Sequence, residues 1–341
     1  MILLRFIKLN NSPLITLFLF SYNQEKYIKQ AVESALAQDY PNLEVIISDD
    51  HSTDNTVGII QSIIQDYSGK HKVALNINPT NLGIGEHVNI AFKMAKGEFI
   101  VFAAGDDISL PQRVSGVVDR WLELDKKVDA IYSDAKLIDQ DGRDCGNLVV
   151  ALSELKPIAY NLISYKPENG VHLLMGASGA YAKNLNNSFG GLLPNVNIED
   201  IPLTIRASLS NGVSYIHEPL VLYRQNVSVW LPRKLENEGF SRHRNRMLYR
   251  LKTNYYVAKQ IVHDVDCVNA DQQTKRAAED RFVATAFVQR CIEKECFLLL
   301  SFLRSLNKTT CWRYMLFPAI FAANPKIHRI IYKTYSLFKG S

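Results

Sequence analysis

The stretch Phe99-Ile-Val-Phe-Ala-Ala-Gly-Asp-Asp107 decides the fold class of this chain. Its apolar part has the length of one strand, and two carboxylates follow directly. Two adjacent carboxylates at the end of a buried strand are costly unless a cation pairs with them. A divalent metal bound to a phosphate would be such a cation, because hard cations prefer carboxylate and phosphate oxygens. Since Gly and Asp also favour turns, a strand-ending turn without a metal is the alternative.

The same pattern extends outward from this stretch. Nearly continuous apolar runs, typical of strands buried on both faces, alternate with segments of helical spacing. This alternation predicts an α/β fold with a mostly parallel central sheet flanked by helices, in which ligands bind beyond the carboxyl ends of the strands. The expected strands are Leu14–Phe20, Leu43–Ser48, Lys72–Asn76 and Phe99–Ala103, and the expected helices are Glu25–Gln38, Thr53–Tyr67 and Gly85–Ala95.

Polar residues gather where three of these strands end, at Ser21-Tyr22-Asn23, Asp49-Asp50 and Asp106-Asp107. One parallel sheet would bring all three groups to the same rim. A carboxylate of the second group could accept a hydrogen bond from a pyrimidine ring N–H, while Tyr22 offers a face for stacking. The alternative is a helix N-terminus, where Asp and Ser are common for capping and dipole reasons.

The later part of the chain gives shorter signals. A helix is expected from Pro111 to about Asp125, and the segment from Arg143 to Pro167 is hard to assign and could be a loop over the site. Beyond Gly239 the pattern is helical. We therefore expect an α/β domain over residues 1–235 and a basic helical region over residues 236–341. Further strands are expected at 130–133, 136–138, 177–182, 213–216 and 220–223, and a further helix at 199–210.

Charge is distributed unevenly along the chain. The net charge is +5, but the part from Phe240 onward has 18 Lys and Arg against 7 Asp and Glu. From Arg304 to the end there are seven basic residues and no acidic one. Basic residues interspersed with aliphatics favour an anionic membrane surface as the partner over nucleic acid. The alternative is a helical subdomain with a solvated basic face; Pro318 and Pro325 are expected to break its helices.

Cysteine usage and hydropathy bound the location. The five cysteines are odd in number and form no Cys-x-x-Cys pair, which favours reduced thiols in a cytosolic setting. No apolar run approaches the length of a transmembrane helix. The expected location is therefore cytoplasmic, at the inner face of the cell membrane through the basic tail.

Several motifs occur in a characteristic order. They are Ser21-Tyr22-Asn23, the segment from Ala37 to Asp54, Asn81-Leu-Gly83, Lys96-Gly-Glu-Phe-Ile100 and Gly105-Asp-Asp107. In this order they resemble family 2 of the glycosyltransferases, inverting enzymes with the GT-A fold. The resemblance covers residues from Leu14 to Tyr223.

The resemblance implies roles for the donor-side residues. Tyr22 and Asp50 match positions that contact the nucleotide base, and Asn81 lies in a further donor-binding motif. Asp106-Asp107 matches the metal-binding carboxylate motif, here followed by Ile108. Asp107 is then the ligand of Mn²⁺ or Mg²⁺, and Asp106 faces the sugar or ribose.

The resemblance also implies roles for residues in the later part of the domain. Asp200, in the acidic pair Glu199-Asp200, is carried over as the general base, although acidic residues also suit a helix N-terminus. Arg224 could meet the donor diphosphate through charge-assisted bonds, or could pair with a surface carboxylate. The small residues from Gly176 to Ala180 would let a sugar approach the backbone, or would pack the sheet.

Two positions depart from the family pattern. Val88 precedes Asn89 where many relatives have Arg, so that an Arg contact to the nucleotide is in doubt unless His87 replaces it. Phe20 stands where some relatives have a small hydroxyl residue near the base.

The implied reaction is metal-dependent transfer, with inversion, of a sugar from a UDP- or TDP-sugar to an acceptor hydroxyl. With the basic tail, the resemblance suggests a polyprenyl-diphosphate-linked glycan acceptor in bacterial surface polysaccharide synthesis, such as O-antigen or capsule. Two alternatives stay open. One is transfer directly to polyprenyl phosphate, and the other is a catalytically inactive partner protein that binds a nucleotide sugar.

Overall fold

The computed structural model describes residues 12–148, 163–164, 175–225, 227, 239–294, 298 and 312–330. The chain divides into two compact units. The first comprises residues 1–157, 172–194 and 199–229, and the second comprises residues 158–171, 195–198 and 230–341. The domain boundary predicted at residue 235 lies outside the described residues, as does most of the segment that was hard to assign.

One mixed sheet forms the centre of the first unit, in the order β3-β2-β1-β4-β8-β6-β9-β5, with β7 paired to β6. The four strands from β3 to β4 are parallel, whereas β8 runs antiparallel to both of its neighbours. The predicted α/β class with a largely parallel sheet is therefore confirmed. The strands are β1 Ile15–Ser21, β2 Leu43–Asp49, β3 Lys72–Ile77, β4 Phe99–Ala104, β5 Ile108–Ser109, β6 Ala130–Ile138, β7 Asp144–Leu148, β8 Ala180–Ala182 and β9 Val213–Arg224.

Three local predictions in the later strands were wrong. The segments 130–133 and 136–138 form one strand, β6, and the segments 213–216 and 220–223 form one strand, β9. Their pairing is irregular, because Ser133 pairs with Ile216 and the next residue, Asp134, with Pro219. A bulge interrupts the period-two pattern without ending the strand, so that each strand looks like two. The predicted strand 177–182 begins as the 3₁₀ turn η2, Gly176–Ser178.

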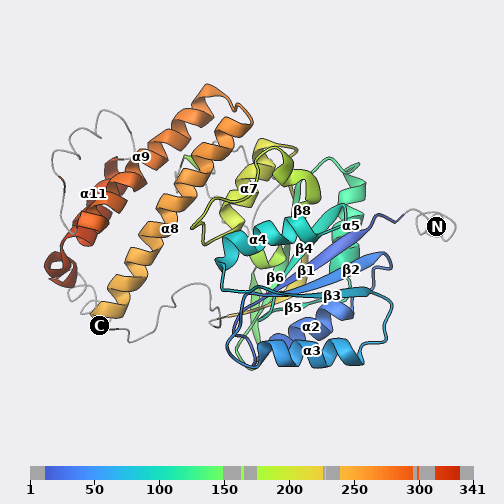
Figure 1. Ribbon diagram of the computed structural model, residues 1–341. Coiled ribbons are helices and arrows are strands. Elements are labelled where there is room, and N and C mark those ends of the chain that lie inside the picture. Colours follow the sequence, from blue (N-terminus) through green and yellow to red (C-terminus); the bar gives the residue numbers. More distant parts are fainter. Residues whose placement is uncertain are drawn as a thin grey trace. The chain divides into compact units, whose positions relative to one another are not determined.

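Helices cover both faces of the parallel part of the sheet (Figure 1). On β1, Ile15, Leu17 and Leu19 belong to the main core cluster, which also includes buried residues of α2, α3 and α5. The alternate residues Phe18 and Phe20 contact the ring of His87 on α4 at the opposite face. Burial on both faces explains the continuous apolar runs. These helices are α2 Ile28–Leu36, α3 Thr56–Asp66, α4 Gly83–Met94 and α5 Arg113–Glu123.

The second unit is helical in its described part and consists mainly of α8 Phe240–Cys267, α9 Gln272–Lys294 and α11 Trp312–Ala323. Phe287 and Cys291 of α9 and Ala319 of α11 share its core cluster. Pro318 lies inside α11, so the expected break at that residue was wrong; the helix ends before Pro325. Among the described residues, no helix is both long and apolar enough to cross a membrane.

Candidate active site

Strand register brings the predicted donor-side residues to one rim. Phe20 of β1 pairs with Ser48 of β2 and with Ala104 of β4. Tyr22, Asp50 and Asp106 each lie two residues beyond this row. The backbone continues the alignment, since the N–H groups of Asp50 and Gly105 donate to the carbonyl oxygens of Ser21 and Phe20, each over 2.9 Å. The rim predicted from the sequence is therefore present.

The Asp50 carboxylate is buried at the N-terminus of α4. Its Oδ1 accepts hydrogen bonds from Asn78 Nδ2 and the Leu82 N–H, and its Oδ2 accepts one from the Gly83 N–H, each at 2.9 Å. Because a carboxylate has about four acceptor positions, these bonds leave one position on Oδ2. The helix N-terminus also stabilises the negative charge. Asp50 is thus held in place with limited acceptor capacity left for a ligand.

The other donor-side residues differ in exposure. Tyr22 is half-buried, and Asn81, in the loop before α4, is exposed. Asp49 accepts hydrogen bonds from Ser21 Oγ, the Ser52 N–H and Ser52 Oγ, at 2.9, 2.7 and 2.6 Å. These bonds fix the loop that follows β2, so Asp49 has a structural function within the rim.

Asp107 is a buried carboxylate with one oxygen that lacks a hydrogen-bond partner. Oδ1 accepts a hydrogen bond of 2.8 Å from the Arg224 N–H, whereas Oδ2 has no partner. Burial and the charge of Asp106 raise the pKa of Asp107 well above its usual range, although the Arg224 N–H bond and the charges of Arg113 and Arg224 act in the opposite direction. A carboxylate in this state favours binding a proton or a cation.

These residues fit a divalent metal of the kind that the sequence predicts. Oδ2 of Asp107 is a hard oxygen ligand, and Asp106 lies beside it at 7% exposure. The described residues contain no group of three or more His, Cys, Asp or Glu side chains that could hold an ion. Mg²⁺ and similar ions are often held by one or two carboxylates together with substrate phosphates. The site thus suits a metal that arrives with a phosphate ligand.

Arg224, the last residue of β9, is buried beneath the Asp106-Asp107 turn. Its Nε donates to the Asp106 carbonyl at 3.0 Å, and its Nη2 donates to Gln30 Oε1 at 2.8 Å. Nη1 donates to the carbonyl of Asp139 at 3.0 Å, and the guanidinium lies 4.8 Å from the centre of the Tyr27 ring. All three nitrogens therefore bond protein oxygens rather than a surface carboxylate. The predicted contact with a diphosphate is not tested by this geometry.

Arg113 is a second buried arginine, 1% exposed at the start of α5. One of its nitrogens, Nη2, donates to the carbonyls of Phe102 and Ala177, at 2.5 and 2.8 Å. Burial lowers the pKa of Arg113 to about 10, and the charge of Asp107 opposes that shift, so the guanidinium stays protonated at neutral pH. Arg113 therefore ties the metal-side strand β4 to the turn η2 and places a cation near Asp107.

The pair Glu199-Asp200 opens α7, Asp200–Leu209. Burial raises the pKa of both carboxyls, and the charge of Asp200 raises that of Glu199 further. A Cβ on Gly176 would lie only 2.5 Å from Glu199 Oε1, so the small residue predicted at this place allows η2 to approach the pair. One of two coupled carboxyls can thus be ionised while the other keeps its proton.

Tyr223 links the two acidic pairs. Burial, together with the charges of Asp107, Asp106, Asp200 and Glu199, raises the pKa of Tyr223 to about 12. The contacts agree: Arg224, next to Tyr223, bonds Asp107, and Arg113 joins β4 to Ala177, the neighbour of the Gly176 that approaches Glu199. The structure therefore brings together the residues predicted for metal binding and for general-base catalysis.

A chain of buried hydroxyls supports the first turn of α7. Thr204 Oγ1 donates to the Asp200 carbonyl at 2.6 Å and also bonds Tyr132 Oη at 2.6 Å. Tyr132 Oη bonds Tyr181 Oη at 3.0 Å. Because a hydroxyl has one hydrogen, Tyr181 must donate to Tyr132, and Tyr132 to Thr204. The chain connects strands β8 and β6 to the backbone of Asp200.

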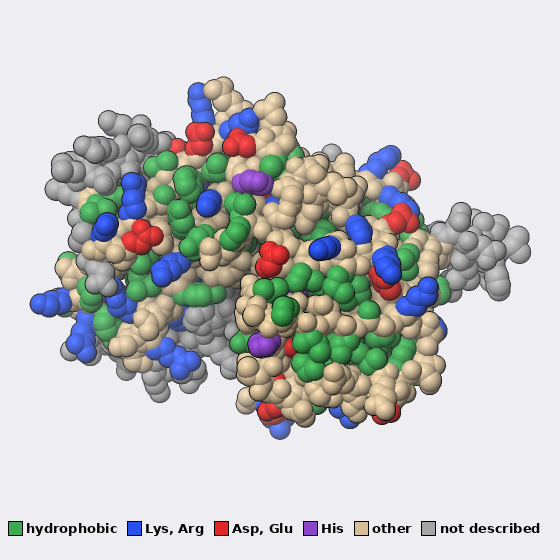
Figure 2. Space-filling model, viewed as in Figure 1, with side chains coloured by type: hydrophobic (Ala, Val, Ile, Leu, Met, Phe, Trp, Pro, Cys, Tyr) green, Lys and Arg blue, Asp and Glu red, His purple; other side chains and the backbone are tan. Residues whose placement is uncertain are grey.

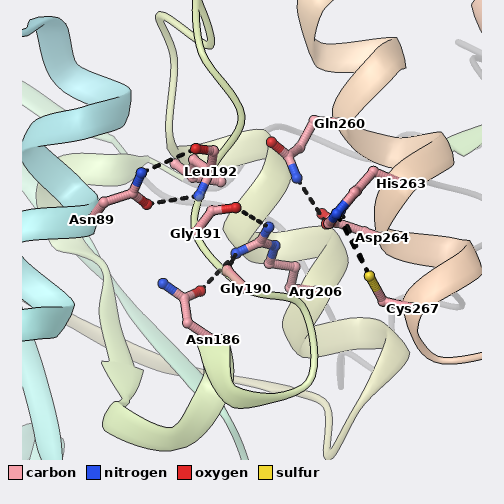
Figure 3. A network of polar contacts seen from close by, with 10 residues as sticks. All are labelled: Asn89, Asn186, Gly190, Gly191, Leu192, Arg206, Gln260, His263, Asp264 and Cys267. Carbon is pink, nitrogen blue, oxygen red and sulfur yellow. Dashed lines mark hydrogen bonds and ion pairs between the residues drawn. The ribbon is translucent and has the colours of Figure 1, made fainter.

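Arg206 anchors the same helix from its far end (Figure 3). It is fully buried, and its Nη1 donates to Asn186 Oδ1 and the Gly190 carbonyl, at 2.7 and 2.9 Å. On α4, Asn89 accepts a hydrogen bond from the Leu192 N–H at 2.6 Å and donates to its carbonyl at 3.0 Å. The loop between Asn186 and Leu192 is therefore held by α7 and α4 together.

His87 does not lie in the loop near the nucleotide-side rim but in the core. It is fully buried, its Nε2 lies 2.6 Å from Ser48 Oγ, and its ring packs edge-on against Phe20 at 5.0 Å. Burial lowers the pKa of His87 to about 4. Phe20 is likewise a core residue at 6% exposure. Val88, which stands where many relatives have Arg, is fully buried too, so both departures from the family pattern lie in the core under the rim.

Sequence reasoning missed four supporting residues: Arg113, Tyr132, Thr204 and Arg206. Each is a polar side chain that is nearly or fully buried. Their only sequence signal is a polar residue within an apolar pattern, which does not identify the partner.

The family comparison agrees with this geometry. The model of the family described as "Glycosyl transferase family 2" matches residues 16–145, from β1 to β7. This segment is a glycosyl transferase family 2 domain. The predicted family is thereby confirmed, and the family 2 domain contains the rim with Tyr22, Asp50, Asp106 and Asp107. Residues 199–224, which supply the second acidic pair and Arg224, follow the matched segment.

Among the individual relatives, similarity of sequence covers a segment of about the same length, and similarity of fold covers more of the chain. Chondroitin synthase of Escherichia coli is 34% identical over 139 residues, which are 41% of this chain and 20% of that protein. Staphylococcus aureus TarS 1–349 in complex with UDP-GlcNAc has a similar structure, with a TM-score of 0.54 over 91% of this chain and 89% of that one, at 19% identity. The Pyrobaculum calidifontis mannosyltransferase PcManGT, in complex with GDP-Man and Mn²⁺, gives 0.50 over 92% and 86%, at 18% identity. The chain spans about a fifth of the length of the first curated relatives that it matches.

Proposed function

We propose that this chain transfers a sugar from a nucleoside-diphosphate sugar to a hydroxyl of a glycan acceptor, with inversion and with a divalent metal. The observation that carries the proposal is the buried Asp107 Oδ2, which lacks a hydrogen-bond partner at the rim of a family 2 domain. The titles of the similar structures support the donor class and the metal, since TarS is in complex with UDP-GlcNAc and PcManGT with GDP-Man and Mn²⁺.

On the donor side, Asp107 would hold Mn²⁺ or Mg²⁺, with Asp106 toward the sugar or ribose. When bound, the metal would neutralise the charge that develops on the leaving diphosphate. Tyr22 would stack on the base, and the remaining acceptor position of Asp50 would receive a base N–H. Asn81 directly precedes Leu82, whose N–H bonds Asp50, and would line the same donor site.

On the acceptor side, Asp200 would remove the proton of the attacking hydroxyl. Its raised pKa suits this function, because a base is most effective when its pKa approaches the working pH. Glu199, raised further by the charge of Asp200, would keep its proton and donate a hydrogen bond to the acceptor. Attack from the face opposite the diphosphate inverts the anomeric centre in a single displacement.

We assign Arg224 to positioning rather than to the diphosphate. Its guanidinium donates to Asp106, Gln30 and Asp139, and its N–H fixes Asp107. In this arrangement Arg224 sets the orientation of the metal-binding turn. Donor binding by the guanidinium would require it to give up several of these bonds.

The acceptor and the location are the finer parts of the proposal. The basic tail supports a polyprenyl-diphosphate-linked acceptor at the inner face of the cell membrane, in synthesis of a surface polysaccharide such as O-antigen or capsule.

A donor screen tests the reaction. UDP- and TDP-sugars are incubated with the full chain and Mn²⁺, with and without EDTA, and nucleotide release is measured. We expect release from one donor that EDTA abolishes. Release that is equal in EDTA would contradict the metal, and binding of a nucleotide sugar without release in the presence of acceptor extracts would favour an inactive binding protein. Label on bare polyprenyl phosphate would indicate direct transfer to the lipid.

A further inference from the structure

The second unit contains two stretches of sequence with cations and no carboxylates. Residues 240–263, which form most of α8, have six Lys and Arg and no Asp or Glu. Residues 304–341 have seven and none. Acidic residues of this unit lie before the first stretch, at Glu168, Glu236 and Glu238, and between the two stretches, from Asp264 onward, where several belong to α9. The membrane contact expected from the sequence involves only the second stretch, although the first has the same kind of composition.

The structure joins the two stretches through Arg244 of α8. Its Nη1 donates to the Phe321 carbonyl at 2.7 Å, and its Nη2 donates to the Ala322 carbonyl at 2.8 Å. Both carbonyls belong to the last turn of α11, where no following helical N–H is available. A cation at a helix C-terminus is also favoured by the helix dipole. Arg244 therefore fixes the start of α8 against the end of α11.

Ring contacts continue this junction into the residues that follow α11. Phe321 stacks on His328 with ring centres 5.6 Å apart, and His328 contacts Phe240 of α8 at 5.2 Å. The guanidinium of Arg329 lies 5.6 Å from the centre of the Phe240 ring. Burial and the charges of His243 and Arg244 lower the pKa of His328 to about 4, so this ring is neutral at pH 7. The rings of the junction thus carry no charge, and its charge comes from the guanidinium groups of Arg244 and Arg329.

The helices and the following residues that form the junction carry exposed apolar and exposed cationic side chains. Phe317, Ile327 and Ile330 are 63%, 39% and 65% exposed. Arg242, Lys326 and Arg329 are exposed as well. Figure 2 shows Lys and Arg side chains gathered over the part of the second unit where α8 begins, in the lower left of the view. Large exposed apolar residues beside cations are typical of segments that lie in a membrane interface.

We propose that these six residues, Arg242, Phe317, Lys326, Ile327, Arg329 and Ile330, form one surface that binds an anionic phospholipid membrane. Both the start of α8 and the residues around and after α11 contribute to this α8–α11 surface. The cations match the negative charge of the lipid headgroups, and the exposed apolar side chains enter the boundary with the acyl chains. This surface rests on the membrane location given in the proposed function. It adds the start of α8 to the C-terminal tail as a membrane contact.

Vesicle sedimentation tests the surface with the full chain. The probes are phosphatidylcholine vesicles with and without about one third phosphatidylglycerol. Arg242→Gln and Lys326→Gln each neutralise one exposed cation, one on α8 and one after α11. We expect each to weaken binding to the anionic vesicles about fivefold, and the double variant about 25-fold, because each basic residue near the surface contributes a similar increment. Arg276→Gln, an exposed cation of α9, is the matched control and should change binding less than about twofold.

The two single variants distinguish a membrane surface shared by α8 and the tail from binding by the tail alone. If Lys326→Gln weakens binding and Arg242→Gln does not, the tail acts alone and the α8–α11 surface is wrong. Equal binding to vesicles with and without phosphatidylglycerol would also overturn it. Ile330→Ser should reduce binding to the anionic vesicles while leaving its dependence on salt unchanged. Nucleotide release without vesicles is measured in parallel, so that loss of transfer and loss of membrane binding are distinguished.

Discussion

The backbone N–H of Arg224 donates a 2.8 Å hydrogen bond to Asp107 Oδ1, across 117 residues of sequence. The bond joins the end of strand β9 to the turn that follows strand β4. It uses one carboxylate oxygen and leaves the other, Oδ2, without a protein partner. One oxygen of Asp107 is therefore fixed by a backbone N–H, which only a proline at position 224 would remove. The other oxygen has no partner in the fold, which indicates a function other than stabilising the fold.

Replacing Asp107 by Asn should separate the metal function from the fold. The amide oxygen can still accept the Arg224 N–H bond, but the carboxylate charge is lost. We expect metal-dependent turnover to fall by at least about a hundredfold, as for the loss of one electrostatic contact to a developing charge. The free energy of unfolding should fall by less than about 1 kcal/mol, because the buried charge is itself unfavourable. Full turnover of Asp107→Asn, measured by nucleotide release, would contradict the metal assignment.

Asp200 should determine the acidic limb of the pH–rate profile. Its pKa is raised by burial, so we expect kcat/KM to rise with pH along a limb centred at least about one unit above the ordinary aspartate value of about 3.9. Asp200→Asn should abolish transfer while calorimetry shows unchanged donor binding.

Glu199→Gln provides the matched control for this limb. Glu199 is still protonated where Asp200 titrates, because the charge of Asp200 raises the pKa of Glu199. The position of the limb should therefore move by less than about half a unit. Loss of transfer in Glu199→Gln, with turnover retained in Asp200→Asn, would show that Glu199 is the base.

Arg224→Lys should destabilise the protein more than it weakens donor binding. Lysine cannot reproduce the bonds to the Asp106 and Asp139 carbonyls and to Gln30. We expect a loss of about 2–3 kcal/mol in urea unfolding. Arg276→Lys, at an exposed site, is the control and should change stability by less than about 0.5 kcal/mol. Unchanged stability together with a raised KM for the donor would instead identify Arg224 as a diphosphate ligand.

Tyr132→Phe should lower kcat through the position of Asp200. The substitution removes the hydroxyl that donates to Thr204 and leaves Tyr181 Oη without its acceptor. We expect about a tenfold lower kcat, an unchanged donor KM, and a loss of about 1–2 kcal/mol in stability. Tyr40→Phe is matched, since Tyr40 also donates a buried bond, to the Pro13 carbonyl at 2.8 Å, but far from Asp200 in the sequence. Equal effects of both variants on kcat would indicate a general loss of stability.

The rim could be predicted from the sequence because local rules determine it. Buried parallel strands are continuous apolar runs, and their carboxyl ends must meet at one edge, so Tyr22, Asp50 and Asp106 follow from strand ends alone. Apart from the joined and shortened strands, the predicted elements differ from the structure by a few residues at their ends. Such differences are expected because hydrophobic patterns do not determine caps.

The supporting contacts could not be predicted because they depend on strand order. The bonds of Arg224 to Asp107 and Gln30, and the bond of Arg113 to Ala177, join segments 64 to 194 residues apart. Nothing local to Arg113 distinguishes a buried guanidinium from a solvated one near the start of a helix. Because the pairing of β6 with β9 is bulged, each of these strands was predicted as two shorter ones. The proline inside α11 was likewise predicted to end a helix.

The bulge in β9 has a consequence for the active site. Between the pairs Ser133–Ile216 and Ala135–Val221, β9 advances five residues while β6 advances two, and regular pairing then continues to Arg224. The side chains of a strand alternate between faces, so a deletion among residues 217–220 that moves the later pairs by one residue would bring each later side chain to the other face. Tyr223 and Arg224 would then exchange faces, and the metal-binding turn would lose its support without any change in its own sequence. The catalytic geometry is thus encoded partly in the length of a bulge rather than in the identity of its residues.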